Sequence, residues 1–140
     1  MTWLGYALLS ALFAAFTAIL AKIGVKDIDS NLATAIRTVV ILFFAWGIVL
    51  FQQTQHHLRS ISKFSLLFLV LSGLATGMSW LFYFKALQLG NVSQVATIDK
   101  LSLIMTILLS ALILKEHLSP MVLGGAALMV SGAILVALGR

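Results

Sequence analysis

The stretch FSLLFLVLSGLATGMSWLFYF, residues 64–84, carries no charged side chain. A helix of about 20 apolar residues is long enough to cross the roughly 30 Å of hydrocarbon in a bilayer. Because lipid offers backbone groups no hydrogen-bonding partner, such a stretch is expected to be a helix. Four further stretches share its character, and together the predicted membrane spans are 3–23, 32–51, 64–84, 95–114 and 121–139. The predicted fold class is therefore an all-α integral membrane protein, with residues 1–140 as one five-helix domain.

The composition also indicates a protein surrounded by lipid. Of the 140 residues 61% are hydrophobic and only 9% are charged, whereas soluble domains carry about 25% charged residues. The absence of cysteine excludes a disulfide scaffold, a thiolate metal site and a cysteine nucleophile. The formal net charge of +5 is scattered along the chain, which favours lipid headgroups and not nucleic acid as the partner.

The breaks between the spans carry turn and cap residues. Ser30 or Asn31 is expected to cap the second span, and Ser119 followed by Pro120 is expected to start the fifth. The first span lacks the basic region that precedes a cleaved signal sequence, so we expect it to be retained.

The loop charges give no clear orientation. Five spans place the two termini on opposite sides, and basic residues in loops normally mark the cytoplasmic side. One side carries Arg59, Lys63 and Lys115, and the other carries Lys22, Lys26, Lys85 and Arg140. Two interpretations stay open: the chain is oriented by something other than charge, or it inserts both ways and pairs with an inverted copy.

Small residues form flat faces on three spans. Alanines recur at three and four residues in the first span, Gly73 and Gly77 form a GxxxG in the third, and Gly125, Gly132 and Gly139 recur every seven residues in the fifth. Such faces let helices approach closely. They suit packing inside one subunit as well as a dimer interface.

Three ionisable residues lie inside predicted spans, namely Arg37, Asp99 and Lys100. Each costs about 2.5–3.5 kcal/mol at a helix centre, so such residues normally face a cavity or a partner. Lys22 and Lys85 end spans on the same side, although snorkelling of their long stems explains both. Threading the five spans places all five residues in one half of the membrane.

These charges allow two interpretations. Asp99 and Lys100 are adjacent and point about 100° apart on a helix, so Asp99 is expected to pair with Arg37 instead. The pair either holds two spans together or serves transport. In the second case Asp99 is the candidate proton-binding group, and Arg37 and Lys100 attract an anionic or zwitterionic solute.

Aromatic and hydroxyl side chains complete the candidate set. Trp80 and Tyr83, with Phe84 beside them, are either interfacial anchors or a wall on which a substrate stacks. The fourth span has a hydroxylated character that suits a wet path or hydrogen bonds between helices; it carries Thr97, Ser102, Thr106 and Ser110.

No catalytic signature occurs in the chain. It has no GxSxG, HExxH or P-loop motif and no paired carboxylates at helical spacing, so an enzyme is not expected. The three histidines lie in predicted loops, where we assign them no role, and we expect neither a metal nor a cofactor.

The assembled features resemble the EamA-like family of the drug/metabolite transporter superfamily. They are Lys22, the opening of the second span at 35–37, the aromatic and glycine-ended segment 82–90, residues 95–97, the turn 114–119 and the glycines of the fifth span. Typical members have ten spans in two inverted five-span repeats, and this chain resembles one repeat. The resemblance implies a homodimer with inverted subunits that works by alternating access in the cell inner membrane.

The chain departs from the family pattern in the fourth span. Many members carry a proline near its middle, where this chain has Ser102 and Leu103 after the charged pair. We therefore expect a straight helix there. The small multidrug resistance branch uses a carboxylate in the first span, which this chain lacks, so proton-coupled export of organic cations is disfavoured.

The functional prediction is transmembrane transport of a small polar metabolite, an amino acid or a related anion or zwitterion. The candidate binding residues are Arg37, Asp99, Lys100, Lys22, Trp80 and Tyr83. The alternative is a membrane subunit that does not transport but scaffolds or regulates a partner, with Arg37 and Asp99 as a purely structural pair.

Overall fold

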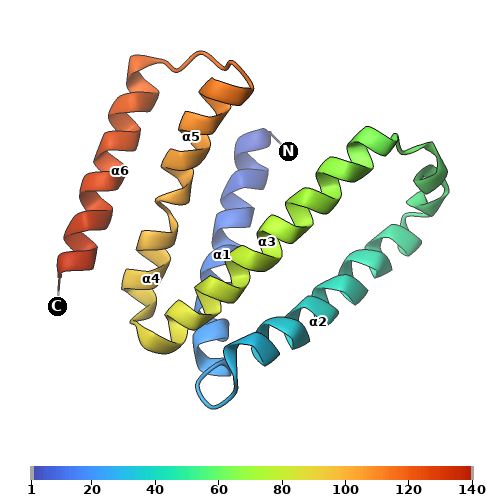
Figure 1. The fold of residues 1–140 in the computed structure, drawn as a ribbon, viewed down its shortest axis with the longest axis horizontal. Coiled ribbons are helices and arrows are strands. Elements are labelled where there is room, and N and C mark those ends of the chain that lie inside the picture. The colour runs from blue at the N-terminus through green and yellow to red at the C-terminus, as the bar shows by residue number, and fades with distance from the viewer. Residues whose placement is uncertain (1, 140) are drawn as a thin grey trace. The chain divides into compact units, whose positions relative to one another are not determined.

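The computed structural model describes residues 2–139, with the backbone alone at Arg59. All of its regular elements are helical, as Figure 1 shows. They are α1 (Trp3–Gly24), α2 (Ser30–Phe51), the short 3-10 helix η1 (Thr54–Ser60), α3 (Lys63–Leu89), α4 (Val92–Asp99), α5 (Ser102–Ile113) and α6 (Pro120–Leu138). The all-α prediction is confirmed.

Five stretches of helix are long and apolar enough to cross a membrane. Four of them are α1, α2, α3 and α6, and the fifth is formed by α4 and α5 together, Val92–Ile113. Large apolar side chains on these helices are mostly exposed, up to 91% for Phe51. An apolar surface of this extent is stable in lipid and not in water, so the prediction of five membrane spans is confirmed.

The contacts divide the chain into two units, and each is described by itself. The first unit is Leu20–Gln88. The second consists of the described residues up to Ile19 together with those from Leu89 onward.

The unit Leu20–Gln88 has its core where α1 ends, α2 begins and α3 ends. Its buried apolar side chains are Ala21, Val25, Ala33, Phe84 and Leu87. The start of α2 is fixed by Asp29, whose carboxylate accepts from the backbone N–H groups of Asn31 at 2.9 Å and Leu32 at 3.1 Å. The expectation that Ser30 or Asn31 caps this helix was wrong, because Asp29 satisfies two of its first amides and Ser30 is already buried in the helix.

In the second unit, α6 packs against α4 and α5. Ser119 caps α6 by accepting from the N–H of Val122 at 3.3 Å, and Pro120 is the first residue of the helix, as predicted. The side-chain amide of Gln94 in α4 donates to the carbonyl of Gly139 at 2.9 Å, which ties α4 to the end of α6.

The fourth span is broken, so the expectation of a straight helix was wrong. Helix α4 ends at Asp99 and α5 begins at Ser102, and the interruption is visible in Figure 1. Around it the N–H groups of Lys100, Leu101, Leu103 and Ile104 donate to carbonyls three residues back, at 2.9–3.2 Å. This is a 3-10 turn inserted between two α-helices.

The break occurs without a proline. Asp99 is the last residue of α4, and Lys100 and Leu101 separate it from Ser102, the first residue of α5. The turn of the backbone, and not a proline ring, therefore interrupts the fourth span.

Candidate functional site

The structure assigns the six predicted residues to two groups. Lys22, Arg37, Trp80 and Tyr83 belong to the unit Leu20–Gln88, and Asp99 and Lys100 belong to the other unit. The predicted pairing of Arg37 with Asp99 joins residues of different units and stays a prediction.

Arg37 is stacked on aromatic rings of α3. It lies two turns after the start of α2 and is half-buried. Its Cζ atom is 4.3 Å from the centroid of the Trp80 ring and 5.3 Å from that of Phe84. A guanidinium within about 6 Å of a ring centroid is attracted by the negative face of the ring. Trp80 and Phe84 are four residues apart, so one face of α3 presents both rings.

The stacked guanidinium has no counter-ion in its own unit. No carboxylate of the described residues 20–88 forms an ion pair with Arg37, and its N–H groups make no hydrogen bond there. Stacking uses the flat faces of the guanidinium and leaves the N–H groups at its edge. Two N–H groups on such an edge can donate parallel hydrogen bonds to the two oxygens of a carboxylate.

Tyr83 and Lys22 flank this stack in different ways. The Tyr83 ring meets Phe84 edge-on, with centroids 6.3 Å apart and an interplanar angle of 73°. The Lys22 ammonium donates to the backbone carbonyl of Leu87 near the end of α3. Lys22 therefore joins the end of α1 to the end of α3, whatever further role it has.

Sequence reasoning missed Gln88. Its side-chain Nε2 donates to the carbonyl of Val25 at 3.0 Å and to that of Ile28 at 2.7 Å. A signal was available, since an uncharged polar residue stands in the segment 82–90 next to the apolar Leu87 and Leu89. Its spacing of four and eight residues from Phe84 and Trp80 places it on the aromatic face of α3.

Asp99 and Lys100 form a loose pair at the break in the fourth span. The Lys100 Nζ lies 3.8 Å from an Asp99 carboxylate oxygen, and the two side chains are 55% and 38% exposed, respectively. We expected adjacent residues on a straight helix to point apart, and the 3-10 turn removes that restriction. The expectation that Asp99 pairs with Arg37, and not with Lys100, therefore did not take this contact into account.

The hydroxyl groups of the fourth span are turned toward their own helix. Thr97 donates to Ser93 at 2.6 Å, Thr106 to Ser102 at 2.9 Å and Ser110 to Ile107 at 3.0 Å, in each case to the backbone carbonyl. Threonine and serine commonly make such bonds inside apolar helices. In the described residues these three hydroxyl groups therefore do not supply the expected bonds between helices.

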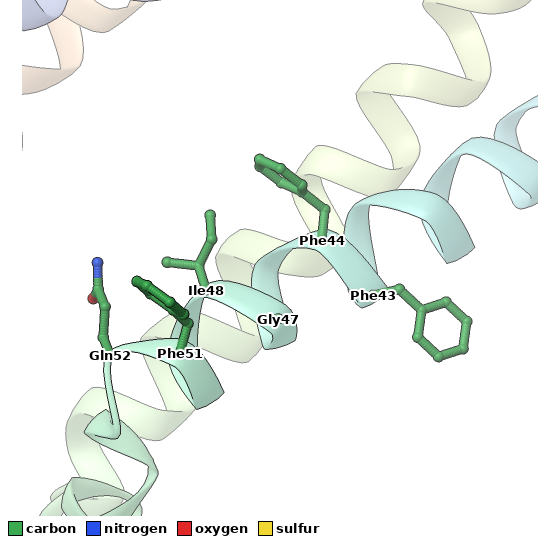
Figure 2. A pocket seen from close by; sticks show the side chains of 6 residues that line it. All are labelled: Phe43, Phe44, Gly47, Ile48, Phe51 and Gln52. Atoms are coloured by element: carbon green, nitrogen blue, oxygen red, sulfur yellow. The ribbon is translucent and has the colours of Figure 1, made fainter.

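An open groove lies at the other end of α2. It has a volume of about 490 Å³ and is lined by Phe43, Phe44, Gly47, Ile48, Phe51 and Gln52. In Figure 2, Gly47, which has no side chain, lies on the helix between residues whose aromatic side chains project outward. Its lining holds no charged side chain, so this groove cannot neutralise an ionic solute as Arg37 can.

Five apolar spans, with a stacked cation inside one of them, are features of a multi-pass membrane protein. The model of the EamA-like transporter family matches residues 1–138. A protein of Sinorhizobium sp described as "Uncharacterized transporter in cobO 3'region" is 48% identical over 136 residues, which cover 97% of this chain and 96% of that protein. No solved structure matches the chain.

The chain belongs to the EamA-like transporter family. It is a multi-pass membrane transporter, and its family is one of transporters and not of enzymes. The resemblance read from the sequence is thereby confirmed.

Proposed function

We propose that this transporter carries a small anionic or zwitterionic metabolite, such as an amino acid or a related acid, across the cell inner membrane. It works by alternating access as a homodimer, and an inverted pair of subunits is the arrangement we favour. Arg37 binds the negative group of the solute, with Trp80 and Tyr83 beside it. Asp99 serves as the proton-binding group, and Lys100 adds to the attraction of a negative solute.

One observation carries this proposal, the Arg37 guanidinium stacked at 4.3 Å on Trp80 without a carboxylate partner in its own unit. Placing a cation inside a membrane span costs free energy, and apolar residues would be enough to pack α2 against α3. The stack fixes the plane of the guanidinium and keeps its edge available. A carboxylate is the ligand that fits this edge best.

Two features support a homodimer. Apart from the surrounding backbone of the same helix, no atom of the described residues lies within 4 Å of the position that a Cβ would take at Gly73 or Gly77 of α3, or at Gly125 or Gly132 of α6. Flat helix faces without a neighbour suit a second helix. The relative from Sinorhizobium sp is matched over 96% of its length, so it is also about the size of one five-span repeat.

The test is uptake by purified protein in liposomes, with a panel of labelled neutral amino acids, acidic amino acids, dicarboxylates and organic cations. We expect saturable uptake of carboxylate-bearing solutes and none of cations. Replacing Arg37 by Lys keeps the charge but loses the bidentate hydrogen bonding. A hydrogen bond to a charged group contributes about 1.5–3 kcal/mol to the binding free energy. The half-saturating concentration should therefore rise at least about tenfold.

The matched control is Lys85→Gln, which removes an exposed cation near the end of α3. It should leave the half-saturating concentration unchanged. Transport of cations by the native protein, or unchanged uptake by Arg37→Gln, would contradict the proposed role of Arg37. A protein that assembles normally but moves no solute would favour the alternative of a scaffolding subunit.

The role of Asp99 is tested separately by Asp99→Asn. If its carboxylate carries the coupled proton, this variant should lose the dependence of uptake on an imposed pH gradient while solute binding survives. Uptake measured across a series of pH gradients decides the point. A rate and a pH dependence equal to those of the native protein would remove Asp99 from the mechanism.

A further inference from the structure

The side chain of Gln88 holds the connection between α1 and α2 onto α3. Its amide nitrogen carries two hydrogens and donates to two carbonyls, that of Val25 at 3.0 Å and that of Ile28 at 2.7 Å. Val25 is 1% exposed and the neighbouring Leu87 is fully buried. Both donors of one planar group are therefore used to bind the loop that leads into α2.

Gln88 lies on the same face of α3 as the aromatic rings that stack on Arg37. On α3, Trp80, Phe84 and Gln88 follow one another at four-residue spacing, so they share one face of the helix. On α2, the buried Ser30 and Thr34 lie on the same face as Arg37. The two faces meet at the end of the unit where its core lies.

The loop held by Gln88 runs directly into the start of α2. Ile28, whose carbonyl accepts the shorter bond, is followed at once by Asp29, the residue that caps the helix. Arg37 lies about two helical turns further on. Because a capped helix moves as a stiff rod over two turns, the position of the loop sets where the guanidinium lies along α3.

We propose that Gln88 is a positioning residue for the solute site: it fixes the register of α2 against α3 and so places Arg37 over Trp80. Lys22 assists by donating to the Leu87 carbonyl, which holds the last turn of α3 against the end of α1. The part that concerns solute binding rests on the proposed function. The part that concerns the position of Arg37 does not.

Among side chains of similar size, glutamine is the one that can donate to both carbonyl groups. A glutamate of the same shape has no donor in its ionised form and places negative charge against two carbonyl oxygens. Leucine fills similar space without a donor and leaves both carbonyls without this partner. Asparagine keeps the amide, but its side chain is one methylene shorter.

The first measurement uses Trp80 as the reporter and needs no solute. In a Trp3→Phe, Trp46→Phe background Trp80 is the remaining tryptophan of the chain. We expect Gln88→Glu and Gln88→Leu to shift its emission and its exposure to a soluble quencher by as much as Arg37→Gln does. Gln88→Asn should give an intermediate shift. Adding Arg37→Gln to Gln88→Glu should cause no further change, because the stack is already lost.

The matched control is Gln94→Leu. Gln94 also donates from its side chain to a backbone carbonyl, that of Gly139, but in the other unit. Its replacement should leave the Trp80 emission unchanged. Unchanged emission in Gln88→Glu and Gln88→Leu would overturn the proposal, and so would an equal shift in Gln94→Leu, since the effect would then be a general loosening of the fold.

Transport kinetics give the second measurement. For a solute that the native protein carries, Gln88→Asn should raise the half-saturating concentration and leave the maximal rate near the native value, as expected of a residue that acts through the position of Arg37. A lower maximal rate with an unchanged half-saturating concentration would overturn the positioning role. If no solute in the panel is carried, the proposed function fails, while the Trp80 measurement still decides the role of Gln88.

Discussion

Arg37 shows how one residue satisfies two opposing demands inside a membrane span. Its charge must be compensated in lipid, and its hydrogen-bonding groups must stay available if it is to bind a solute. The stack on Trp80 and Phe84 meets the first demand through the ring faces. It leaves the edge of the guanidinium for the second.

The contribution of this stack can be measured by a double-mutant cycle with Arg37→Gln and Trp80→Leu. Cation–π contacts are worth about 0.5–1 kcal/mol at exposed sites and about 2 kcal/mol when desolvated. For the half-buried Arg37 we expect a favourable coupling of about 1 kcal/mol in the free energy of unfolding, measured by denaturant titration in detergent micelles.

The control cycle pairs Arg37→Gln with Trp46→Leu. Trp46 lies on α2 with 43% of its surface exposed, and it makes no cation–π contact with Arg37 in the described residues. This cycle should be additive. Equal coupling in both cycles would show that the Trp80 contact contributes nothing specific.

At the scale of single residues, the sequence does not specify how each helix is rotated about its own axis. Hydropathy singled out Arg37 as a cation inside a span, and the aromatic group included Trp80 and Phe84. That the guanidinium lies on those rings depends on how α2 and α3 are turned toward each other, which no local pattern specifies. Gln88 was missed for the same reason, because its two acceptors lie about 60 residues away in the chain.

At the scale of the element, the break in the fourth span places two charges beside two helix ends. Asp99 is the last residue of α4, where a negative charge is unfavourable, and Lys100 lies between that helix end and Leu101, the N-cap of α5. Exchanging the two, as Asp99→Lys with Lys100→Asp, keeps the composition and puts a cation at the end of α4 and an anion beside the N-cap of α5. Each such interaction is worth about 0.3–1 kcal/mol, so we expect a gain of about 0.5–1 kcal/mol in the free energy of unfolding.

A neutral pair, Asp99→Asn with Lys100→Gln, is the matched control and should lie between the native and the exchanged protein. Amide hydrogen exchange gives a second measurement. The N–H groups of Leu103 and Ile104, which bond only three residues back, should exchange more slowly in the exchanged protein because the helix ends beside them are more stable. Equal stability of all three proteins would show that the break does not depend on these charges.

Hydropathy predicted most of the helical fold, and the errors of that prediction have local causes. Five spans were correctly predicted because length and apolar character are enough to identify them. The break was not predicted because the fourth span contains no proline, the usual cause of a kink. The third helix runs on to Leu89, five residues beyond the predicted end, and Lys85, which we placed at the end of the span, lies within the helix.

At the scale of the whole molecule, little apolar surface is buried within the chain. Among the described residues seven hydrophobic side chains are buried, whereas side chains such as Trp3, Phe51 and Met121 are more than 80% exposed. Lipid covers such surfaces without needing a partner. The glycine faces differ, because flat surfaces gain most from a second helix that can approach closely. These faces and the balanced loop charges are the features that support the proposed pair of identical chains in opposite orientations.

Opposite orientations can be detected directly, because the chain has no cysteine. Asp27→Cys and His56→Cys place one exposed thiol each in the two loops at either end of α2. If the loop charges leave orientation undecided, a membrane-impermeant maleimide should label about half of each variant in intact cells. A single orientation would give full labelling of one variant and none of the other. Labelling after permeabilisation, which should be complete for both, shows that each thiol is reactive and that the half-labelling reports topology.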